Sequence, residues 1–325
     1  MVTFSRNEIV ELLEMPFDDF ERNIIPQAKS AYIKARGNVI VATAVLGYGN
    51  ICKNTCLYCG MRAPNKNLRR FRMSPDEIVD TAKNARDMGF TRIFMLSGED
   101  MGFGFDNILQ AVRGVKELGF FISLACGEFT EDEFGRMRDA GVNEYALKFE
   151  MADEEVFARL NPSTNFAKRM NSIRNVQKSG MLLASGGLVD YPGQTTEQLA
   201  DDILLAKELD ISWAPIIPYQ PAAGTPLAEE GGRGSIETNL RHIAILRIMM
   251  PSININAQQP GKVIENGLAD EQGNLDALNA GGNILFYDLL PLQTGQDFRP
   301  VDNRNTANYN HLHRMSELSG MPLVF

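Results

Sequence analysis

The stretch Tyr48–Arg62, Y-G-N-I-C-K-N-T-C-L-Y-C-G-M-R, contains three of the four cysteines of the chain. The C-x3-C-x2-C spacing places Cys52, Cys56 and Cys59 on one short loop. Thiolates are soft ligands that suit Fe–S clusters and zinc. A structural zinc site needs a fourth ligand, and Cys126 is far along the chain. Three thiolates around a [4Fe–4S] cubane leave one iron without a protein ligand, and that iron can bind a small molecule.

Other interpretations of the three cysteines remain open. A zinc ion completed by a distant histidine would use the same thiolates, and such a site could belong to a binding protein without catalysis. A chance group of buried cysteines fits less well, because free cysteines rarely gather in this way. A disulfide is disfavoured by the low cysteine count and the lack of a secretory signature. The spacing therefore favours a [4Fe–4S] cluster with one open iron.

Composition and charge exclude several classes of function. The chain has 325 residues, 44% of them hydrophobic and 22% charged, as is ordinary for a globular enzyme. Its formal net charge of −9 argues against a nucleic-acid partner, which would require a basic face. The N-terminal residues resemble neither a signal peptide nor a transit peptide, and no apolar run approaches the roughly 20 residues of a membrane span. We therefore expect a cytoplasmic protein with no membrane contact.

Strand and helix patterns alternate along most of the chain, which predicts a parallel sheet. The expected strands are 38–46, 92–97, 120–125, 144–149, 181–188, 212–217, 253–257 and 283–289. The expected helices are 74–88, 105–118, 130–140, 165–179, 195–209, 235–250, 274–280 and 308–318. Eight strands with helices between them predict an α/β fold with a complete (β/α)8 TIM-type barrel.

The expected domain organisation is simple. Residues 1–37 form an N-terminal helical cap, with two amphipathic helices between residues 5 and 35 placed on the closed end of the barrel. Residues 38–325 form the barrel with its C-terminal helix, and the whole chain is one domain. The basic residues Lys66, Arg69, Arg70 and Arg72 are expected to form a solvated face, with docking of an acidic electron donor as the less favoured role.

Barrels of this kind carry their chemistry at the C-terminal ends of the strands. Gly98 and Glu99 follow the second strand, where glycine permits close backbone approach and the carboxylate suits an ammonium group. Glu128 follows the third strand, next to Cys126, which we expect to be a buried small hydrophobe. Lys148 and Glu150 alternate with apolar residues, so we expect them to face the barrel lumen.

Further candidates follow from the other loops. Arg169, early in the helix after the fourth strand, offers a guanidinium fork that suits a carboxylate. Gly187 and Leu188 offer a flat backbone to an aromatic ring, and Tyr58 lies beside the cluster. After the last three strands, the candidates for substrate contacts are Tyr219, Gln220, Thr225, Gln258, Gln259 and Tyr287.

The motif C-K-N-T-C-L-Y-C resembles the cluster-binding motif of the radical S-adenosylmethionine (SAM) superfamily, and S-G-E-D, L-K-F-E, Arg169 and G-G-L-V follow in the family's order. This resemblance implies that the open iron binds SAM, that Glu99 binds its amino group, that Glu150 reaches its ribose and that Arg169 pairs with its carboxylate. The implied chemistry is reductive cleavage of SAM to methionine and a 5′-deoxyadenosyl radical. The residues expected to hold the cluster are Cys52, Cys56 and Cys59, and those expected to bind SAM are Tyr58, Gly98, Glu99, Glu128, Lys148, Glu150, Arg169, Gly187 and Leu188.

Within the superfamily, the chain resembles the biotin synthase-like branch, first the [FeFe]-hydrogenase maturase HydE family and then the methylornithine synthases. C-L-Y-C-G-M-R, L-S-G-E-D, Y-P-G-Q-T and G-T-P-L carry the HydE likeness. The family's Arg-His-Glu-Thr is replaced by residues 148–151, K-F-E-M, and the last two loops do not match; L-N-A-G-G-N at 278–283 leans toward methylornithine synthase. The additional C-terminal cysteines of some HydE proteins are missing, so we expect one cluster.

The resemblance implies a small amino-acid-derived or organometallic substrate and an electron donor such as flavodoxin or ferredoxin. The leading hypothesis is HydE-like maturation of a hydrogenase cofactor. The alternative is an amino-acid carbon-skeleton mutase resembling methylornithine synthase. A second alternative is a non-catalytic Fe–S or zinc-binding protein.

Overall fold

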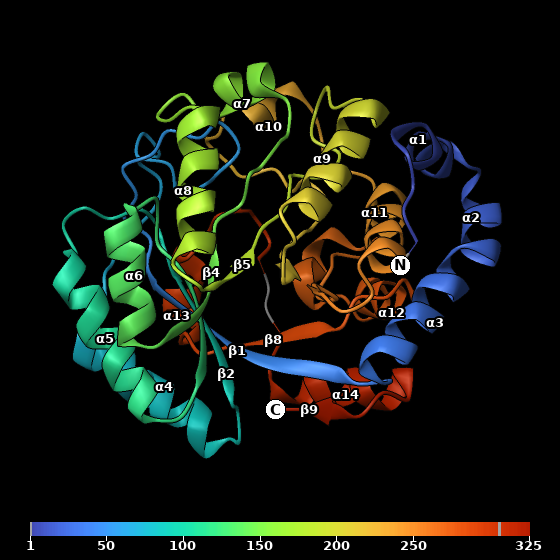
Figure 1. The fold of residues 1–325 in the computed structure, drawn as a ribbon. Helices are drawn as coiled ribbons and strands as arrows, with labels where there is room; N and C mark the ends of the chain where they lie inside the picture. Colours follow the sequence, from blue (N-terminus) through green and yellow to red (C-terminus); the bar gives the residue numbers. More distant parts are fainter. Residues whose placement is uncertain (1, 305–306) are drawn as a thin grey trace.

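A parallel barrel forms the centre of the computed structural model, which describes residues 2–304 and 307–325 (Figure 1). Neighbouring strands follow the order β7-β6-β5-β4-β3-β2-β1-β8. An isolated bridge between Asn256 and Ile284 closes the ring, supported by a 2.9 Å hydrogen bond from Ala257 N to Ile284 O. The strands are β1 Ile40–Gly49, β2 Arg92–Ser97, β3 Phe121–Ala125, β4 Val142–Ala146, β5 Leu182–Ala184, β6 Trp213–Ala214, β7 Asn254–Ile255 and β8 Ile284–Asp288. The expected (β/α)8 barrel is confirmed.

A layer of helices surrounds the barrel, and several begin at the caps that the sequence predicts. Ser74, Thr130 and Thr195 each accept a hydrogen bond from the backbone three residues on, within complete capping boxes. The main outer helices are α4 Pro75–Asp87, α5 Phe105–Glu117, α6 Glu131–Ala140, α8 Phe166–Lys178, α9 Thr196–Glu208, α11 Ile236–Met249, α12 Glu271–Asn279 and α14 Tyr309–Ser319. Shorter helices in the connecting loops are α7 Glu154–Leu160, α10 Leu227–Glu230, the 3-10 helix η1 Ile264–Ala269 and α13 Leu292–Asp297.

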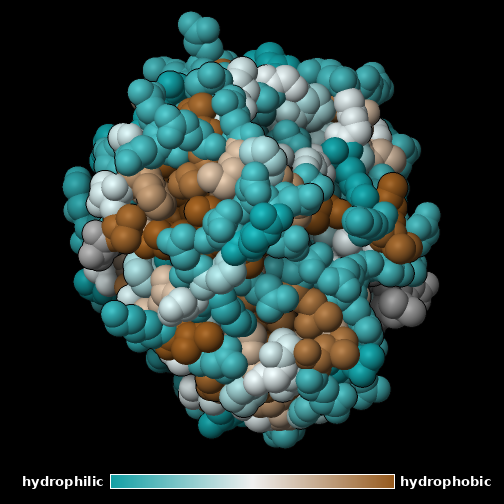
Figure 2. All heavy atoms as spheres, turned by 90° about the vertical axis from the view of Figure 1, so that its right-hand side faces the viewer, coloured by the Kyte–Doolittle hydropathy of each residue, from teal (hydrophilic) through white to brown (hydrophobic). Residues whose placement is uncertain are grey.

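The N-terminal segment forms three helices where the sequence pattern predicted two. They are α1 Arg6–Glu14, α2 Phe17–Asn23 and α3 Ile25–Arg36. Pro16 stands at the N-cap of α2 and Pro26 in the first turn of α3, so each proline restarts the helix. These helices contact α9, α11 and α12, and therefore extend the helical layer along that flank of the barrel. Figure 2 shows this side of the molecule: hydrophilic side chains cover most of it, and hydrophobic ones form separate patches.

The strands differ in length around the barrel. β1 is ten residues long, whereas β6 and β7 have two residues each. The strand expected over 181–188 ends at Ala184, and its continuation makes only an isolated bridge between Gly187 and Glu150. An unexpected short strand, β9 Leu323–Val324, pairs in parallel with the start of β1. The loops after β6 and β7 therefore begin low in the barrel, which leaves room in the lumen on that side.

Aromatic side chains fill the lower part of the lumen. Phe94 packs edge-on against Trp213 with ring centroids 4.9 Å apart, and Phe286 lies 5.9 Å from Trp213. Val45 and Ala184 belong to the same buried cluster. This layer forms the apolar floor of a cavity that opens toward the C-terminal ends of the strands.

Candidate active site

The cysteine loop after β1 is held in place by one arginine. Arg70 Nη1 donates to the carbonyl oxygens of Asn50 at 2.6 Å and Met61 at 2.8 Å. Its Nη2 donates to the carbonyl oxygens of Arg62 at 2.7 Å and Asn65 at 3.0 Å. The expectation that this basic run is only a solvated face is therefore wrong for Arg70, whose five N–H donors suit a loop with many unpaired carbonyls.

Asn50 joins the same loop to two other segments. Its Nδ2 donates to the carbonyl oxygens of Arg69 at 2.9 Å and Asp297 at 2.7 Å. Its Oδ1 accepts from the backbone N–H of Phe71 at 2.8 Å. Asn50 is completely buried, so these partners satisfy a side chain that water cannot reach.

Gly98 is required by the close approach of the cysteine loop to the end of β2. A Cβ at this position would lie 2.3 Å from Ile51 O and 2.7 Å from the Cβ of Cys52. The sequence predicted that the backbone at Gly98 approaches a ligand closely. The loop itself makes that approach, and Gly98 thereby fixes the position of Cys52 relative to β2.

Three free thiols lie on this loop, and each is half-buried. Burial raises the pKa of Cys56 and of Cys59 to about 12. Burial also raises the pKa of Cys52, although the backbone amides of Asn54 and Glu99 act in the opposite direction by hydrogen bonding to its sulfur. Thiolates here therefore need a positive partner, which an iron cluster supplies, and amide donors to sulfur are typical of Fe–S sites.

The arrangement of the thiols bears on which metal group they fit. Within residues 2–304 and 307–325, no three His, Cys, Asp or Glu side chains converge closely enough to hold a single metal ion. A mononuclear zinc site requires such convergence. In a cubane each thiolate binds a different iron, so the sulfurs stand further apart. The thiolate chemistry and the C-x3-C-x2-C spacing of Cys52, Cys56 and Cys59 suit an Fe–S cluster.

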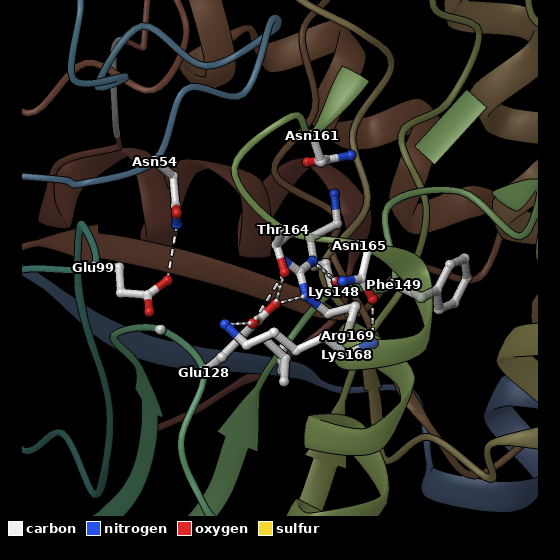
Figure 3. Close-up of polar contacts among 12 residues, drawn as sticks. Asn54, Glu99, Glu128, Lys148, Phe149, Asn161, Thr164, Asn165, Lys168 and Arg169 are labelled. Carbon is white, nitrogen blue, oxygen red and sulfur yellow. Dashed lines mark hydrogen bonds and ion pairs between the residues drawn. The ribbon is translucent and has the colours of Figure 1, made fainter. Parts of the chain in front are cut away.

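Glu99 projects from the end of β2 toward the cysteine loop. Its carboxylate pairs with Lys53 Nζ at 2.6 Å. It also accepts a hydrogen bond from Asn54 Nδ2 at 2.8 Å (Figure 3). Gly127, with φ +123°, leaves space for it, because a Cβ there would lie 2.3 Å from Glu99 Cγ. The side chain is 9% exposed. A buried carboxylate that already accepts an ammonium group is suited to bind a ligand ammonium.

A second group of charges surrounds Glu128, after β3. Arg169 Nε donates to Glu128 Oε1 at 2.8 Å, and Lys168 Nζ lies 3.3 Å from Oε2 (Figure 3). Thr164 Oγ1 donates to the same carboxylate at 3.2 Å. Burial raises the pKa of Glu128, but the charge and hydrogen bond of Arg169, together with Lys168, outweigh burial and lower it. Glu128 is therefore ionised at neutral pH and orients the guanidinium of Arg169.

Glu150 adopts an unusual backbone conformation, with φ +66°. Its backbone accepts from Leu188 N at 2.7 Å, which ties it to the loop after β5. Its Oε2 lies 3.2 Å from Lys148 Nζ, and in the described part of the chain it has no hydrogen-bond partner. Strained residues of this kind cluster at functional sites. The geometry leaves the Glu150 carboxylate available to hydroxyl groups of a ligand.

A cavity of about 440 Å³ connects these groups with the lumen. It is mostly apolar, with the aromatic floor below and the cysteine loop at its edge. Of the residues predicted from the sequence, the cavity is lined by Tyr58, Cys59, Lys148, Glu150, Arg169, Leu188, Tyr219, Gln220 and Gln258. Gly98, Glu99, Glu128 and Gly187 are not among the residues that line it.

Tyr58 links the cysteine loop to the segment after α7. Its hydroxyl donates to Asn161 Oδ1 at 2.7 Å, and Asn161 is completely buried. The backbone also joins these segments, through Leu57 N to Leu160 O at 2.9 Å. Sequence reasoning placed Tyr58 beside the cluster but missed Asn161, which has no nearby motif.

Three expected substrate contacts lie outside the cavity. Tyr287 stacks on Phe90 at 5.5 Å on the outer face of β8, because alternate residues of a strand face opposite sides and Phe286 takes the inward place. Thr225 donates its hydroxyl to Ala222 O at 2.7 Å within a turn. Gln259 donates to Ile216 O at 2.8 Å in the barrel wall. Cys126 is buried beside Tyr145, as expected of a small hydrophobe.

Three cavity residues were missed. Trp213 lies on the floor, and Asn256 accepts a hydrogen bond from its indole at 3.0 Å. Asn256 stands two residues before Gln258, so the alternation of side chains along a strand could have indicated that Asn256 also faces the lumen. Arg304, which pairs with Asp288 at 2.9 Å, lies in an irregular segment without a sequence signal.

No helix among the described residues is long and apolar enough to cross a membrane.

The model of the radical SAM superfamily matches residues 46–206. The chain is 33% identical over 323 residues to the [FeFe] hydrogenase maturase subunit HydE of Thermotoga maritima, covering 98% of this chain and 91% of that protein. It is 25% identical to the biotin synthase of Synechococcus sp., over 94% and 91% of the two chains.

Among solved structures, methylornithine synthase (PylB) superposes with a TM-score of 0.86, at 24% identity and over 100% of this chain and 95% of that one. This likeness supports the complete barrel.

Proposed function

The chain belongs to the radical SAM superfamily, and from that premise we propose that it is a hydrogenase-cofactor maturase of the HydE kind. When bound, the [4Fe–4S] cluster supplies the electron that cleaves SAM to methionine and a 5′-deoxyadenosyl radical. The observation that carries the proposal is the shared cavity: Cys59 of the cysteine loop, Glu150 and Arg169 line one space above an apolar floor. Its substrate is a small amino-acid-derived or organometallic molecule.

Each polar group around the cavity receives a role from its contacts. Cys52, Cys56 and Cys59 hold the cluster. Glu99, which already accepts the Lys53 ammonium, receives the SAM amino group. Arg169, oriented by Glu128, receives the SAM carboxylate.

The ribose and adenine require different surroundings. The Glu150 carboxylate, whose Oε2 accepts no hydrogen bond from the described residues, accepts from the ribose hydroxyls. Lys148 sets the position of Glu150 through their ion pair. The backbone at Gly187 and the side chain of Leu188 provide an apolar face for the adenine ring, next to Glu150 in the isolated bridge.

The electron donor is a flavodoxin or ferredoxin, which are acidic proteins. Three cations around the cysteine loop and the Glu128 group are well exposed: Lys53 at 42%, Arg69 at 74% and Lys168 at 55%. They provide positive charge for steering an acidic partner, despite the negative net charge of the chain. All four cysteines are free thiols, which suits the reducing cytoplasm.

The test of this function is product formation by the anaerobically reconstituted protein with SAM and dithionite. We expect 5′-deoxyadenosine and methionine in equal amounts. Protein with a full cluster that forms neither product would overturn the proposal.

The HydE-like role has its own test. We expect the protein to support assembly of active [FeFe]-hydrogenase in a reconstituted maturation system from which the resident maturase is left out. The alternative is an amino-acid mutase, which the barrel shared with PylB accommodates. Rearrangement of lysine without hydrogenase assembly would favour that alternative.

A further inference from the structure

Two carboxamide side chains line the cavity on the β7 side, and the orientation of both amides is fixed. Asn256 Oδ1 accepts from the indole N–H of Trp213 at 3.0 Å. Gln258 Oε1 accepts from the backbone N–H of Phe286 at 2.7 Å. An N–H group can pair only with the oxygen of a carboxamide, so these partners identify the other end of each side chain as NH2.

Both NH2 groups face the cavity without an acceptor among the residues of the described structure. The side chains of Asn256 and Gln258 line the cavity, and the two residues are 8% and 2% exposed. They stand two residues apart on the extended segment beyond β7, so they point to the same side. Their neighbours on the floor are Phe94, Trp213 and Phe286, which offer no acceptor. A donor that lines a cavity without a protein acceptor can pair with an acceptor oxygen of a ligand.

The charge around the cavity indicates what kind of acceptor fits. The described lining residues include three cationic side chains, Lys148, Arg169 and Arg304, and one carboxylate, Glu150. Lys148 and Arg169 belong to the β4 side, where the SAM groups are assigned. Arg304 follows β8, and its side chain is only 12% exposed, with its direction fixed by Asp288. A guanidinium that lines the same cavity as two amide donors suits a planar anion with two oxygens.

We propose that Asn256, Gln258 and Arg304 form a carboxylate-binding site, and that the substrate of this enzyme carries a carboxylate at this end of the cavity. The proposal deepens the proposed function, because it assigns a chemical class to the substrate of the same cavity. Asn256 and Gln258 each donate an N–H to a carboxylate oxygen, and Arg304 supplies the charge. The apolar floor holds the adjoining carbon chain, while the reacting carbon or sulfur faces the SAM side.

The protein carries its own probe for this site. Trp213 is the single tryptophan of the chain, and its indole contacts Asn256. Reconstituted protein labelled with 5-fluorotryptophan therefore gives one ¹⁹F resonance. We expect acetate and propionate to shift this resonance saturably, with a Kd in the millimolar range. Acetamide and propanamide, which have the same shape without the charge, should bind at least tenfold more weakly.

Two substitutions replace only the NH2 group. Gln258→Glu and Asn256→Asp keep the oxygen that accepts from Phe286 or Trp213 and place a second oxygen toward the cavity. We expect each variant to weaken acetate binding at least tenfold. Gln110→Glu, an exposed position on α5, is the matched control and should leave acetate binding unchanged.

The outcomes separate this proposal from the proposed function. Equal binding of acetate and acetamide by the unsubstituted protein would overturn the carboxylate site, and so would the lack of a saturable shift of the ¹⁹F resonance. This test does not need the variants, so it holds even where a substituted protein fails to fold. Tighter binding of inorganic phosphate than of acetate would also overturn it. Formation of 5′-deoxyadenosine by the same preparation tests the proposed function separately, since acetate binding without SAM cleavage would refute the function and retain the site.

Discussion

The two halves of the barrel treat their polar groups differently. On the β1–β5 side, the cysteine loop, Glu99 and the Glu128–Arg169 pair are held by short hydrogen bonds and ion pairs within the chain. On the β6–β8 side, β6 and β7 have two residues each, and the side-chain amides of Asn256 and Gln258 line the cavity without an acceptor among the described residues. We propose that the first half is preorganised for the cluster and SAM, and that the bound substrate completes the second half.

The largest expected effect on activity is that of a substitution on the β1–β5 side, here called the cofactor half; the β6–β8 side is called the substrate half. Cys52→Ala should abolish cluster binding and all SAM cleavage, because the two remaining thiolates cannot hold the cubane. Iron and sulfide analysis and 5′-deoxyadenosine formation measure the two effects. Cys126→Ala, which removes a buried thiol outside the loop, should retain both. SAM cleavage by Cys52→Ala would contradict the ligand assignment.

Arg70→Gln should come next. In the native chain, Arg70 donates hydrogen bonds to four carbonyl oxygens, and glutamine has no charged donors to replace those of the guanidinium. We therefore expect the free energy of unfolding to fall by about 3 kcal/mol. Cluster occupancy after reconstitution should fall in parallel. Arg69→Gln, at an exposed neighbour, is the control and should change neither quantity measurably. Full occupancy in Arg70→Gln would show that the loop forms without its four contacts.

Glu128→Gln tests whether the charge pair of the cofactor half positions Arg169. The amide retains the shape of the carboxylate but not its charge, so the guanidinium is less firmly oriented. We expect the KM for SAM to rise about tenfold, equivalent to about 1.4 kcal/mol of binding. Steady-state kinetics of 5′-deoxyadenosine formation measures this. A fall in kcat without a change in KM would contradict a positioning role in SAM binding.

The same pair predicts a pH dependence of stability. The pKa of Glu128 in the folded protein lies below its ordinary value of 4.5, because Arg169 and Lys168 outweigh burial. Its contribution is therefore present above that value and is lost as the pH falls through the folded-state pKa. Urea unfolding of the cluster-free protein should show the unsubstituted chain more stable than Glu128→Gln at pH 7, with a difference that shrinks below pH 4.5. A constant difference would refute the ion pair.

The smallest effect is expected for Tyr58→Phe. It removes the hydrogen bond to Asn161 and the interaction of the hydroxyl with the sulfur of Cys56, and should cost about 1 kcal/mol of stability. The ring still covers the cavity beside Cys59, so SAM cleavage should continue at a similar rate. Thermal unfolding and turnover together test this, and loss of turnover would assign the hydroxyl a direct role.

The candidate residues of the β1–β5 side could be selected from the sequence because their signals are local. Thiolate spacing, a Gly-Glu pair at a strand end and alternating charges each follow from a few adjacent residues. The hydrogen-bond partners of these residues could not be predicted. Arg70 was expected to be a surface cation, because its contacts with the loop carbonyls exist only after the loop has folded back on itself.

The substrate half resisted prediction for physical reasons. Tyr287 was assigned to the cavity because the sequence does not determine which alternate residues of β8 face the lumen. In the structure Phe286 faces inward and Tyr287 faces outward. Arg304 lies in an irregular segment whose place depends on the whole barrel. The lumen-facing role of Asn256 depends on Trp213, a strand away.

The central claim is that the three thiolates hold a cluster whose open iron binds SAM. Electron paramagnetic resonance of the dithionite-reduced, reconstituted protein, recorded with and without SAM, tests it directly. We predict the signal of a reduced [4Fe–4S] cluster whose g-values change when SAM is added. A [4Fe–4S] signal that stays identical in the presence of excess SAM would contradict the account.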